Sequence, residues 1–479
     1  MTRALVTLVV SLVVALAQGR TPIDTPPAPS LVGDWTQFGW DVARSNASPD
    51  DTGITAANVA TLVRQRVVLE DGVDASPIFL GGVTVNGATH DTLFMTTSYG
   101  KTIAIDAANG VVLWTYTPPA YSTWFGSRQI TAATPVADPT RQFIYAASPD
   151  GRIQQLAVAD GHAAWSTAIT LLPQREKIAS SLNYFNGRVI ATTGGYVGDA
   201  PPYQGHVALL DAATGSLLHV WNSLCSDRAG LLDPSSCPES GSAIWGRAGA
   251  VVDAATGNIF VATGNGRWDG RTYWGDATLE LDPDATRLIG SYTPTNTASL
   301  DQLDLDIGST SPVLVGGDFL AQGGKDHLIR LLSVQQMAAA LVGRELQTVA
   351  TPSGSDLFTA PAVWRNGAAT LVITADAGAT AAWSLVSGLL QQQWRAPNGG
   401  TSPVVAGGLV FAHDPSGGLR VYDAASGAAV TRLDCGGGHW DSPIVVPGLI
   451  AMPESTTPGN PGALNIWRLP GARRITRRR

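Results

Sequence analysis

A repeated sequence unit runs along almost the whole chain and constrains the fold more than any other feature. Its clearest copy, residues 401–427, begins T-S-P-V-V-A-G-G-L-V-F and ends L-R-V-Y-D-A-A-S-G. Short β-branched runs in each copy alternate as half-buried strands do, and the D-a-x-T-G segment supplies a tight turn. Each copy holds four such strands in roughly 40 to 60 residues, which is the size of a propeller blade.

The number of copies predicts the number of blades. The copies open at Ser76-Pro77, Thr134-Pro135, Ile178, Trp245, Ser311-Pro312, Ala360-Pro361, Ser402-Pro403 and Ser442-Pro443. The last copy is shortened, and residues 62–69 form one strand ahead of the first copy, so their pairing would close the ring and remove an open edge. We therefore predict an all-β, eight-bladed propeller of four-stranded antiparallel blades over residues 62–470. Only residues 334–345 have a helical pattern.

Composition excludes several classes of protein. The 479 residues are 44% hydrophobic and 14% charged, which rules out intrinsic disorder. The 30 Lys and Arg against 38 Asp and Glu give a net charge of -8, which argues against nucleic acid as a partner. The basic segment 471–479 is interpreted as a solvated tail.

The N-terminus predicts export. Arg3 precedes an uncharged, mostly apolar stretch that ends in A-L-A, so residues 1–17 are predicted to be a signal peptide cleaved after Ala17. Residues 18–61 would form a lead-in segment, no later run is long enough to cross a bilayer, and the mature protein is expected to be secreted or periplasmic. In such a compartment Cys225 and Cys237 are expected to form a disulfide, with two free thiols as the alternative, and Cys435 is expected to stay a thiol.

The copies resemble the PQQ-like β-propeller repeat of quinoprotein alcohol dehydrogenases and outer-membrane assembly propellers. The opening Trp35-Thr36-Gln37-Phe38-Gly39 resembles the lead-in of that family. The resemblance of I-W-G at 244–246 and A-T-G-N at 262–265 implies that Trp245 is the floor on which PQQ lies and that Asn265 coordinates Ca²⁺.

Two further motifs follow in the same order as in the family. The segment D-Q-L-D at 301–304 resembles a D-x-W-D motif, which implies that Asp304 is the catalytic base and a metal ligand. The segment G-G-K-D at 323–326 implies that Lys325 contacts the quinone carbonyls. The chemistry is coherent, because Ca²⁺ prefers hard oxygen ligands, a carboxylate can take the alcohol proton, and an ammonium stabilises a developing oxyanion.

The chain also departs from the family. It has no adjacent cysteine pair, no Glu where Ser180-Ser181-Leu182-Asn183 stands, Leu303 in place of a Trp, and no C-x-x-C-H motif for haem attachment. Each candidate also has a structural alternative: Trp245 can pack between blades, and Asn265 lies in a G-N-G turn.

Two functions therefore stay open. The first, which these departures from the family favour, is a secreted binding or scaffolding module without catalysis, whose channel mouth meets a small-molecule ligand or a protein. The other is a PQQ- and Ca²⁺-dependent dehydrogenase that oxidises an alcohol or a sugar. The loops 196–203 and 267–274 are expected at that mouth, where their aromatic residues would stack on a ligand or pack the loops down. Convergence of Trp245, Asn265, Asp304 and Lys325 on one axial pocket, with enough carboxylates for Ca²⁺, would favour the dehydrogenase.

Overall fold

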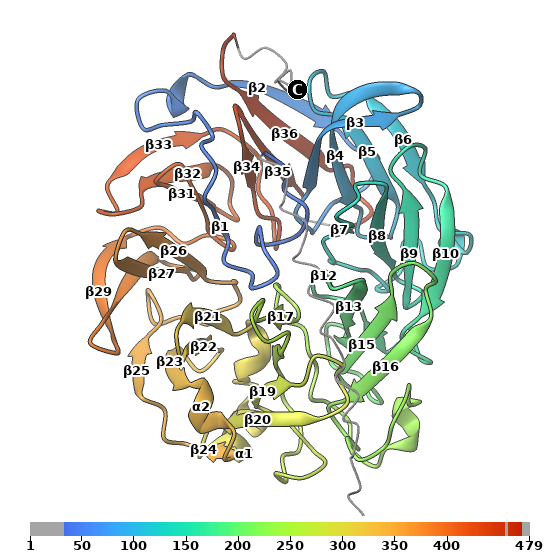
Figure 1. The fold of residues 1–479 in the computed structure, drawn as a ribbon, viewed down its shortest axis with the longest axis vertical. Coiled ribbons are helices and arrows are strands. Elements are labelled where there is room, and N and C mark those ends of the chain that lie inside the picture. Colours follow the sequence, from blue (N-terminus) through green and yellow to red (C-terminus); the bar gives the residue numbers. More distant parts are fainter. Residues whose placement is uncertain (1–32, 456–457, 472–479) are drawn as a thin grey trace, which may run out of the picture.

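The computed structural model describes residues 33–455 and 458–471. Eight antiparallel sheets are arranged around a common axis, each with its first strand innermost (Figure 1). The prediction of an all-β, eight-bladed propeller is confirmed. Apolar residues of neighbouring sheets form the core clusters, because each blade buries its faces only against the next blade.

The first four blades follow the chain in order. Blade 1 is β3 (Ile78–Val85), β4 (Ala88–Thr96), β5 (Thr102–Asp106) and β6 (Val112–Tyr116). Blade 2 is β7 (Val136–Ala137), β8 (Phe143–Ser148), β9 (Arg152–Ala157) and β10 (Ala163–Ala168). Blade 3 is β12 (Asn183–Phe185), β13 (Arg188–Thr192), β15 (His206–Asp211) and β16 (Leu217–Asn222), beside the small sheet β11 (Glu176–Lys177) and β14 (Gly194–Gly195). Blade 4 is β17 (Val251–Val252), β18 (Ile259–Ala262), β19 (Thr278–Leu281) and β20 (Leu288–Thr293).

The other four blades complete the ring. Blade 5 is β21 (Val313–Gly316), β22 (Phe319–Gly323), β23 (Leu328–Ser333) and β25 (Gln347–Ala350). Blade 6 is β26 (Ala362–Asn366), β27 (Ala369–Ala375), β28 (Thr380–Val386) and β29 (Leu389–Ala396). Blade 7 is β30 (Val404–Ala406), β31 (Leu409–His413), β32 (Leu419–Asp423) and β33 (Ala429–Leu433). Blade 8 is β34 (Ile444–Val446), β35 (Leu449–Glu454), β36 (Ala463–Arg468) and an N-terminal strand, β2 (Val63–Val68).

The N-terminal strand closes the ring as predicted. β2 pairs antiparallel with β36, from Val63 opposite Arg468 to Val68 opposite Ala463. The last blade thereby gains its fourth strand from the N-terminal part of the chain. The paired residues Val68 and Ala463 are 395 positions apart in the sequence. Because β36 is now paired on both sides, by β35 and by β2, the shortened last copy leaves no gap in the ring.

Tryptophans join consecutive blades through the D-a-x-T-G turns. The indole Nε1 of Trp165 in blade 2 donates to the carbonyl oxygen of Ala212 in blade 3 at 3.1 Å. A Cβ on Gly215 of the same turn would lie 2.5 Å from that indole, so the turn needs glycine for this close approach as well as for its positive φ. Trp114 and Trp394 repeat the contact with the following blade.

The lead-in segment runs across one end of the ring. β1 (Ala47–Ser48) pairs parallel with β30, and Trp35 pairs with Phe79 of β3. Backbone oxygens of this segment also accept hydrogen bonds from Ala137 in blade 2 and Val363 in blade 6. These contacts fall at the second or third residues of the innermost strands β3, β7, β26 and β30, so the lead-in segment ties four blades together near the axis.

The helix expected over residues 334–345 is wrong in extent. α2 covers only Val334–Met337, and Ala340 and Arg344 have positive φ values that end helical geometry. Leu341 is buried where β24 (Leu341–Val342) adds a parallel strand to β20.

One helix was not predicted, α1 (Thr297–Leu303). Short 3₁₀ turns lie at Val59–Thr61, Tyr121–Thr123, Pro234–Ser236 and Ile307–Ser309. Within the described residues, neither helix has the length or the apolar run needed to span a membrane.

Candidate functional site

The four predicted site residues come from equivalent positions of two neighbouring blades. Trp245 precedes the innermost strand of blade 4, and Asn265 follows the second strand of that blade. Asp304 precedes the innermost strand of blade 5, and Lys325 follows its second strand. In an antiparallel blade the first strand begins where the second ends, so all four residues lie at the same end of the axis.

The side chains of these residues meet. Asn265 Nδ2 donates to Asp304 Oδ1 at 2.6 Å, and the Lys325 ammonium contacts the same carboxylate. Lys325 Nζ lies 5.4 Å from the centroid of the Trp245 ring, in cation–π geometry. The structure therefore brings together all four residues. Their roles in cofactor binding, metal binding and catalysis remain predictions.

Asp306 holds this arrangement together. Its Oδ2 accepts a hydrogen bond from Trp245 Nε1 at 3.1 Å, and its Oδ1 lies 2.6 Å from Lys325 Nζ. Burial raises the pKa of Asp306 to about 6, against the opposing effect of the Lys325 charge. A Cβ on Gly264 would lie 2.8 Å from Asp306 Oδ2, so the G-N-G turn is also needed for this approach. Trp245 thus differs from the blade-joining tryptophans, whose Nε1 groups bind backbone carbonyls.

Two acidic residues near the site were not predicted. Asp199 lies in the loop 196–203, hydrogen-bonds to Tyr203, and has its pKa raised by burial and by nearby Asp304. Burial raises the pKa of Asp276 to about 8, and the neighbouring Asp306 adds to this rise. Asp199 lies later in the same copy as residues 180–183, and the length of its loop was the signal available in the sequence.

The segment 180–183 has a structural role instead. Ser180 Oγ donates to the Ile244 carbonyl oxygen at 3.2 Å. Asn183 Nδ2 donates to the carbonyl oxygens of Val42 and Ala250. These side chains join blade 3 to blade 4 and to the lead-in segment.

Aromatic side chains extend the site across the axis. The Trp245 and Phe358 ring centroids are 6.0 Å apart, and those of Phe358 and Trp440 are 5.5 Å apart. His439 packs on Trp440 at 4.4 Å. Phe358 and Trp440 precede the innermost strands of blades 6 and 8, and both are half-buried. The three rings come from three blades and are inclined to one another, by 47° between Trp245 and Phe358 and by 65° between Phe358 and Trp440.

The donor atoms suit a hard cation, in part. Asn265 Oδ1 is buried and has no hydrogen-bond partner among the described residues, and Asp304, which accepts from Asn265 Nδ2 at 2.6 Å, adds carboxylate oxygens. In the described part of the chain, no three His, Cys, Asp or Glu side chains are grouped closely enough to hold a metal ion. A Ca²⁺ ion here would therefore need further oxygen ligands from a bound cofactor. The amide, the carboxylates, the indole face and the ammonium fit PQQ together with Ca²⁺.

The disulfide prediction is confirmed. Cys225 and Cys237 are bonded, and Cys435 is a buried free thiol. Trp274 of the loop 267–274 is 5% exposed and donates to Ser226 Oγ at 3.0 Å, so this aromatic residue packs the loop against the disulfide segment.

A cavity of about 480 Å³ lies elsewhere, between the outer strands of blades 5 and 6. Its one charged lining residue is Arg395, whose Nε already donates to the Pro352 carbonyl oxygen at 2.6 Å. The axial cluster carries far more chemically reactive groups, and we place the candidate site there.

Comparison with known proteins agrees with the fold. The family model described as outer membrane protein assembly factor BamB matches residues 51–267 and 296–432. The chain belongs to this family of PQQ-like β-propellers.

Several relatives are alcohol dehydrogenases. Quinohemoprotein alcohol dehydrogenase ADH IIB of Pseudomonas putida is 26% identical over 60% of this chain and 43% of its own length. Polyvinylalcohol dehydrogenase of Sphingopyxis sp. (strain 113P3) is 23% identical over 87% of this chain and 70% of its own length. The crystal structure of quinohemoprotein alcohol dehydrogenase from Comamonas testosteroni superposes with a TM-score of 0.68 at 18% identity, covering 93% of this chain and 82% of that enzyme. The chain thus spans less than half of the Pseudomonas relative, and the likeness to the crystal structure shows the fold alone.

Proposed function

We propose that this chain is a quinoprotein-type dehydrogenase that oxidises an alcohol or a sugar hydroxyl with PQQ and Ca²⁺ at the axial site. The observation that supports this proposal is the meeting of Trp245, Asn265, Asp304 and Lys325 in one contact network.

Each residue has a part in the proposed reaction. PQQ, when bound, would accept the hydride from the alcohol carbon. Asp304 is 66% exposed at the C-terminal end of α1, so its carboxylate is accessible to a substrate hydroxyl and can take the proton. Lys325, only 13% exposed, holds a positive charge beside the Trp245 face. Asn265 and Asp304 would hold the cation, with Asp199 as the additional charged ligand.

Asp306 orients this machinery without meeting the substrate. It is buried, it fixes the edge of the Trp245 indole through Nε1, and it fixes Lys325 through the ammonium. Loss of the Asp306 carboxylate should therefore change the orientation of both the Trp245 indole and the Lys325 ammonium.

The proposal is tested by binding before activity. PQQ should quench tryptophan fluorescence, Ca²⁺ should tighten the binding, and Asn265→Ala should remove the Ca²⁺ effect. Asn258→Ala is the matched control, because that amide lies in the same blade but bonds to Glu280 at 2.7 Å. Asp304→Asn should abolish dye-linked alcohol oxidation while PQQ still binds. Absence of quenching at high micromolar PQQ, with or without Ca²⁺, would refute the proposal in favour of a binding module.

We also propose that the protein works outside the cytoplasm, secreted or periplasmic. The bond between Cys225 and Cys237 supports this, since such bonds persist in oxidising compartments. The predicted signal peptide at residues 1–17 lies outside the described residues. Cell fractionation with N-terminal sequencing of the mature protein is the test, and a mature N-terminus at Met1 in the cytoplasmic fraction would contradict the proposal.

A further inference from the structure

A second charged cluster lies at the same end of the axis, and it is basic. We infer that Lys177 and Arg247 form a binding site for a carboxylate group carried by a flat aromatic ligand. This inference rests on the proposed function, because PQQ is an aromatic tricarboxylate and would be that ligand. The residues differ from those of the acidic network around Asp304 and come mainly from blades 3 and 4.

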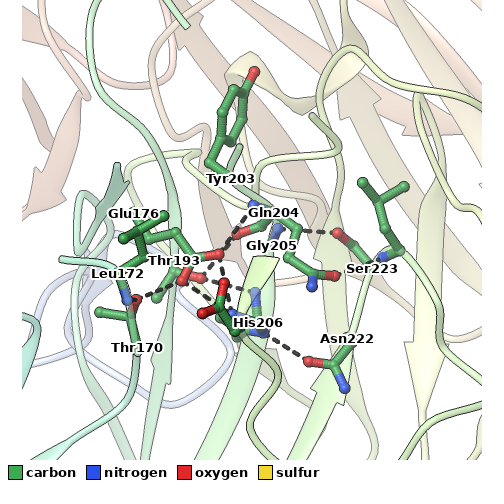
Figure 2. Close-up of polar contacts among 12 residues, drawn as sticks. Thr170, Leu172, Glu176, Thr193, Tyr203, Gln204, Gly205, His206, Asn222 and Ser223 are labelled. Carbon is green, nitrogen blue, oxygen red and sulfur yellow. Dashed lines mark hydrogen bonds and ion pairs between the residues drawn. The ribbon is translucent and has the colours of Figure 1, made fainter. Parts of the chain in front are cut away.

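The strand β11 fixes the direction of Lys177. Its other residue, Glu176, is fully buried and is held by the Thr170 hydroxyl, the Gln204 backbone N–H at 3.1 Å and His206 Nε2 at 3.2 Å (Figure 2). Because successive side chains in a strand point to opposite sides, Lys177 points away from this cluster. The buried Glu176 network therefore anchors a strand whose second side chain, that of Lys177, points to the opposite side from that network.

The neighbouring strand places Lys177 near the aromatic floor. Lys177 pairs with Gly194 of β14. A Cβ on Gly194 would lie 3.2 Å from Trp245 Cβ, so Gly194 packs directly against the residue that forms the floor. Strand β14 thus lies between Lys177 and Trp245. Because Gly194 has no side chain, Trp245 packs closely against the backbone of that strand.

The Lys177 ammonium has no partner of its own. The residue is 9% exposed, and within the described part of the chain its Nζ forms neither a hydrogen bond nor an ion pair. The charges of Asp74 and Arg247 act on the pKa of Lys177, the first raising it and the second lowering it. Arg247 also has an unsatisfied donor, since its buried Nε has no hydrogen-bond partner among the described residues.

The carboxylate of Asp74 is already used. Its Oδ1 accepts from the Trp440 backbone N–H at 2.7 Å, and its Oδ2 lies 3.1 Å from His439 Nδ1. Arg247 donates through its terminal nitrogens to backbone carbonyl oxygens, which carry no full charge. Two buried cations therefore share one carboxylate that has other partners.

The only other acid that acts on these groups is offset by its own partner. Asp441 is buried with its Oδ1 3.6 Å from His413 Nδ1, and the charge of Asp441 helps to raise the pKa of His413 to about 11. The imidazolium of His413 balances Asp441, which leaves one positive charge in excess at Lys177 and Arg247. Burial accordingly lowers the pKa of Lys177 to about 8, despite the attraction of Asp74.

A bound carboxylate would supply the missing charge. A buried ion without a partner is strongly unfavourable, and pairing with an anion removes that cost. The surrounding rings select the rest of the ligand: Trp245, Phe358 and Trp440 present flat apolar surfaces, and Arg247 lies 5.5 Å from the Trp440 ring centroid. The ligand class is therefore an aromatic carboxylate rather than a simple anion.

The test compares three probes on three proteins. The probes are PQQ, its trimethyl ester, and 1,2,4-benzenetricarboxylate, which has the carboxylates without the quinone. The proteins are the wild type, Lys177→Gln and the control Lys101→Gln, whose ammonium pairs with Glu70 at 2.8 Å outside the site. We expect Lys177→Gln to weaken PQQ binding by about tenfold or more, as loss of one partner of a buried charge pair does, and to leave ester binding within about twofold. Lys101→Gln should leave all affinities unchanged.

A second measurement does not depend on the variant folding. The chain has only three lysines, at 101, 177 and 325, so ¹³C,¹⁵N-lysine labelling gives three side-chain signals that Lys101→Gln helps to assign. Saturation with PQQ or benzenetricarboxylate should shift the Lys177 signal, and the ester should not. An unmoved Lys177 signal at saturating PQQ, or equal PQQ affinity in wild type and Lys177→Gln, would overturn the inference.

The two proposals fail differently. If PQQ does not bind but benzenetricarboxylate binds and shifts the Lys177 signal, the proposed dehydrogenase is wrong and the carboxylate site stands. If PQQ binds with Ca²⁺ but the Lys177 signal does not shift and Lys177→Gln binds PQQ as tightly as the wild type, the carboxylate site is wrong and the dehydrogenase stands. If neither acid binds, both are refuted.

Discussion

Replacing Arg247 by methionine should destabilise the whole ring, because this guanidinium joins blades across the axis. Its Nη2 donates to the carbonyl oxygens of Asp74 at 2.9 Å and Trp440 at 3.2 Å. Its Nη1 lies 3.4 Å from the Ala132 oxygen and 3.5 Å from the Ala179 oxygen. These acceptors precede the innermost strands of blades 1, 8, 2 and 3, while Arg247 itself belongs to blade 4.

The expected loss follows from the two shorter bonds. A hydrogen bond from a charged donor contributes about 1.5 to 3 kcal/mol, and the two longer contacts are counted as zero. Methionine fills most of the volume and spares the desolvation of a buried cation, but it leaves the carbonyl oxygens of Asp74 and Trp440 without this donor. We therefore expect Arg247→Met to lower the free energy of unfolding by about 3 to 5 kcal/mol.

Urea denaturation of Arg247→Met and Arg188→Met provides the comparison. Arg188 also donates to a carbonyl oxygen, that of Pro283 at 3.0 Å, and pairs with Asp284 at 2.5 Å, but its side chain is 34% exposed. Solvent screening limits the loss at Arg188 to less than about 1 kcal/mol. Equal losses in the two variants, or a loss below about 1 kcal/mol for Arg247→Met, would refute the idea that this residue ties the blades together.

Three further predictions concern the blade turns, the disulfide and pH. Gly215→Ala should cost about 2 to 4 kcal/mol in thermal unfolding because a Cβ meets an indole at positive φ, whereas Gly187→Ala, with the same sign of φ and open space, should cost only about 1 to 2 kcal/mol. Replacing both Cys225 and Cys237 by serine should lower the opening free energy of their loop by about 3 kcal/mol in hydrogen exchange, and unchanged protection would contradict this. The pKa of His413 is raised to about 11, so its stabilising contribution is complete below about pH 6.5 and is lost as pH rises toward 11. The stability difference between wild type and His413→Gln should therefore shrink as pH rises, and a difference that grows would contradict this.

The fold was predictable because one repeating unit specifies one blade. The glycine of each turn and the tryptophan of the preceding blade, such as Gly215 and Trp165, are local sequence features with a fixed spatial meaning. The strand at Val63–Val68 was also predictable. The last copy lacks an outer strand, and the strand ahead of the first copy has no blade of its own, so pairing the two completes the last blade. The helix over 334–345 failed because burial of Leu341 beside β20 outweighs the local helical pattern.

The candidate site was predictable only where a motif carried it. Asp304 and Lys325 lie in segments whose order along the chain indicated a shared site. Asp199, Phe358 and Trp440 come from other blades, and no spacing within the sequence shows that their side chains reach the same end of the axis. Their place depends on how the blades are arranged around the ring, which the repeat count implies only in outline.

The loop that carries Trp245 and Arg247 explains why the axial end has two chemically different sides. The two residues are separated by one glycine, yet Trp245 Nε1 is bound to Asp306, whereas Arg247 reaches Asp74 and Trp440. This short loop thus contacts two clusters. One is the acidic network of Asp304 and Asp306 with Lys325, and the other is the basic pair Lys177 and Arg247. A ligand with a metal-binding quinone edge and carboxylates elsewhere on its ring would have one favourable orientation between them, because turning it over would place carboxylates against carboxylates.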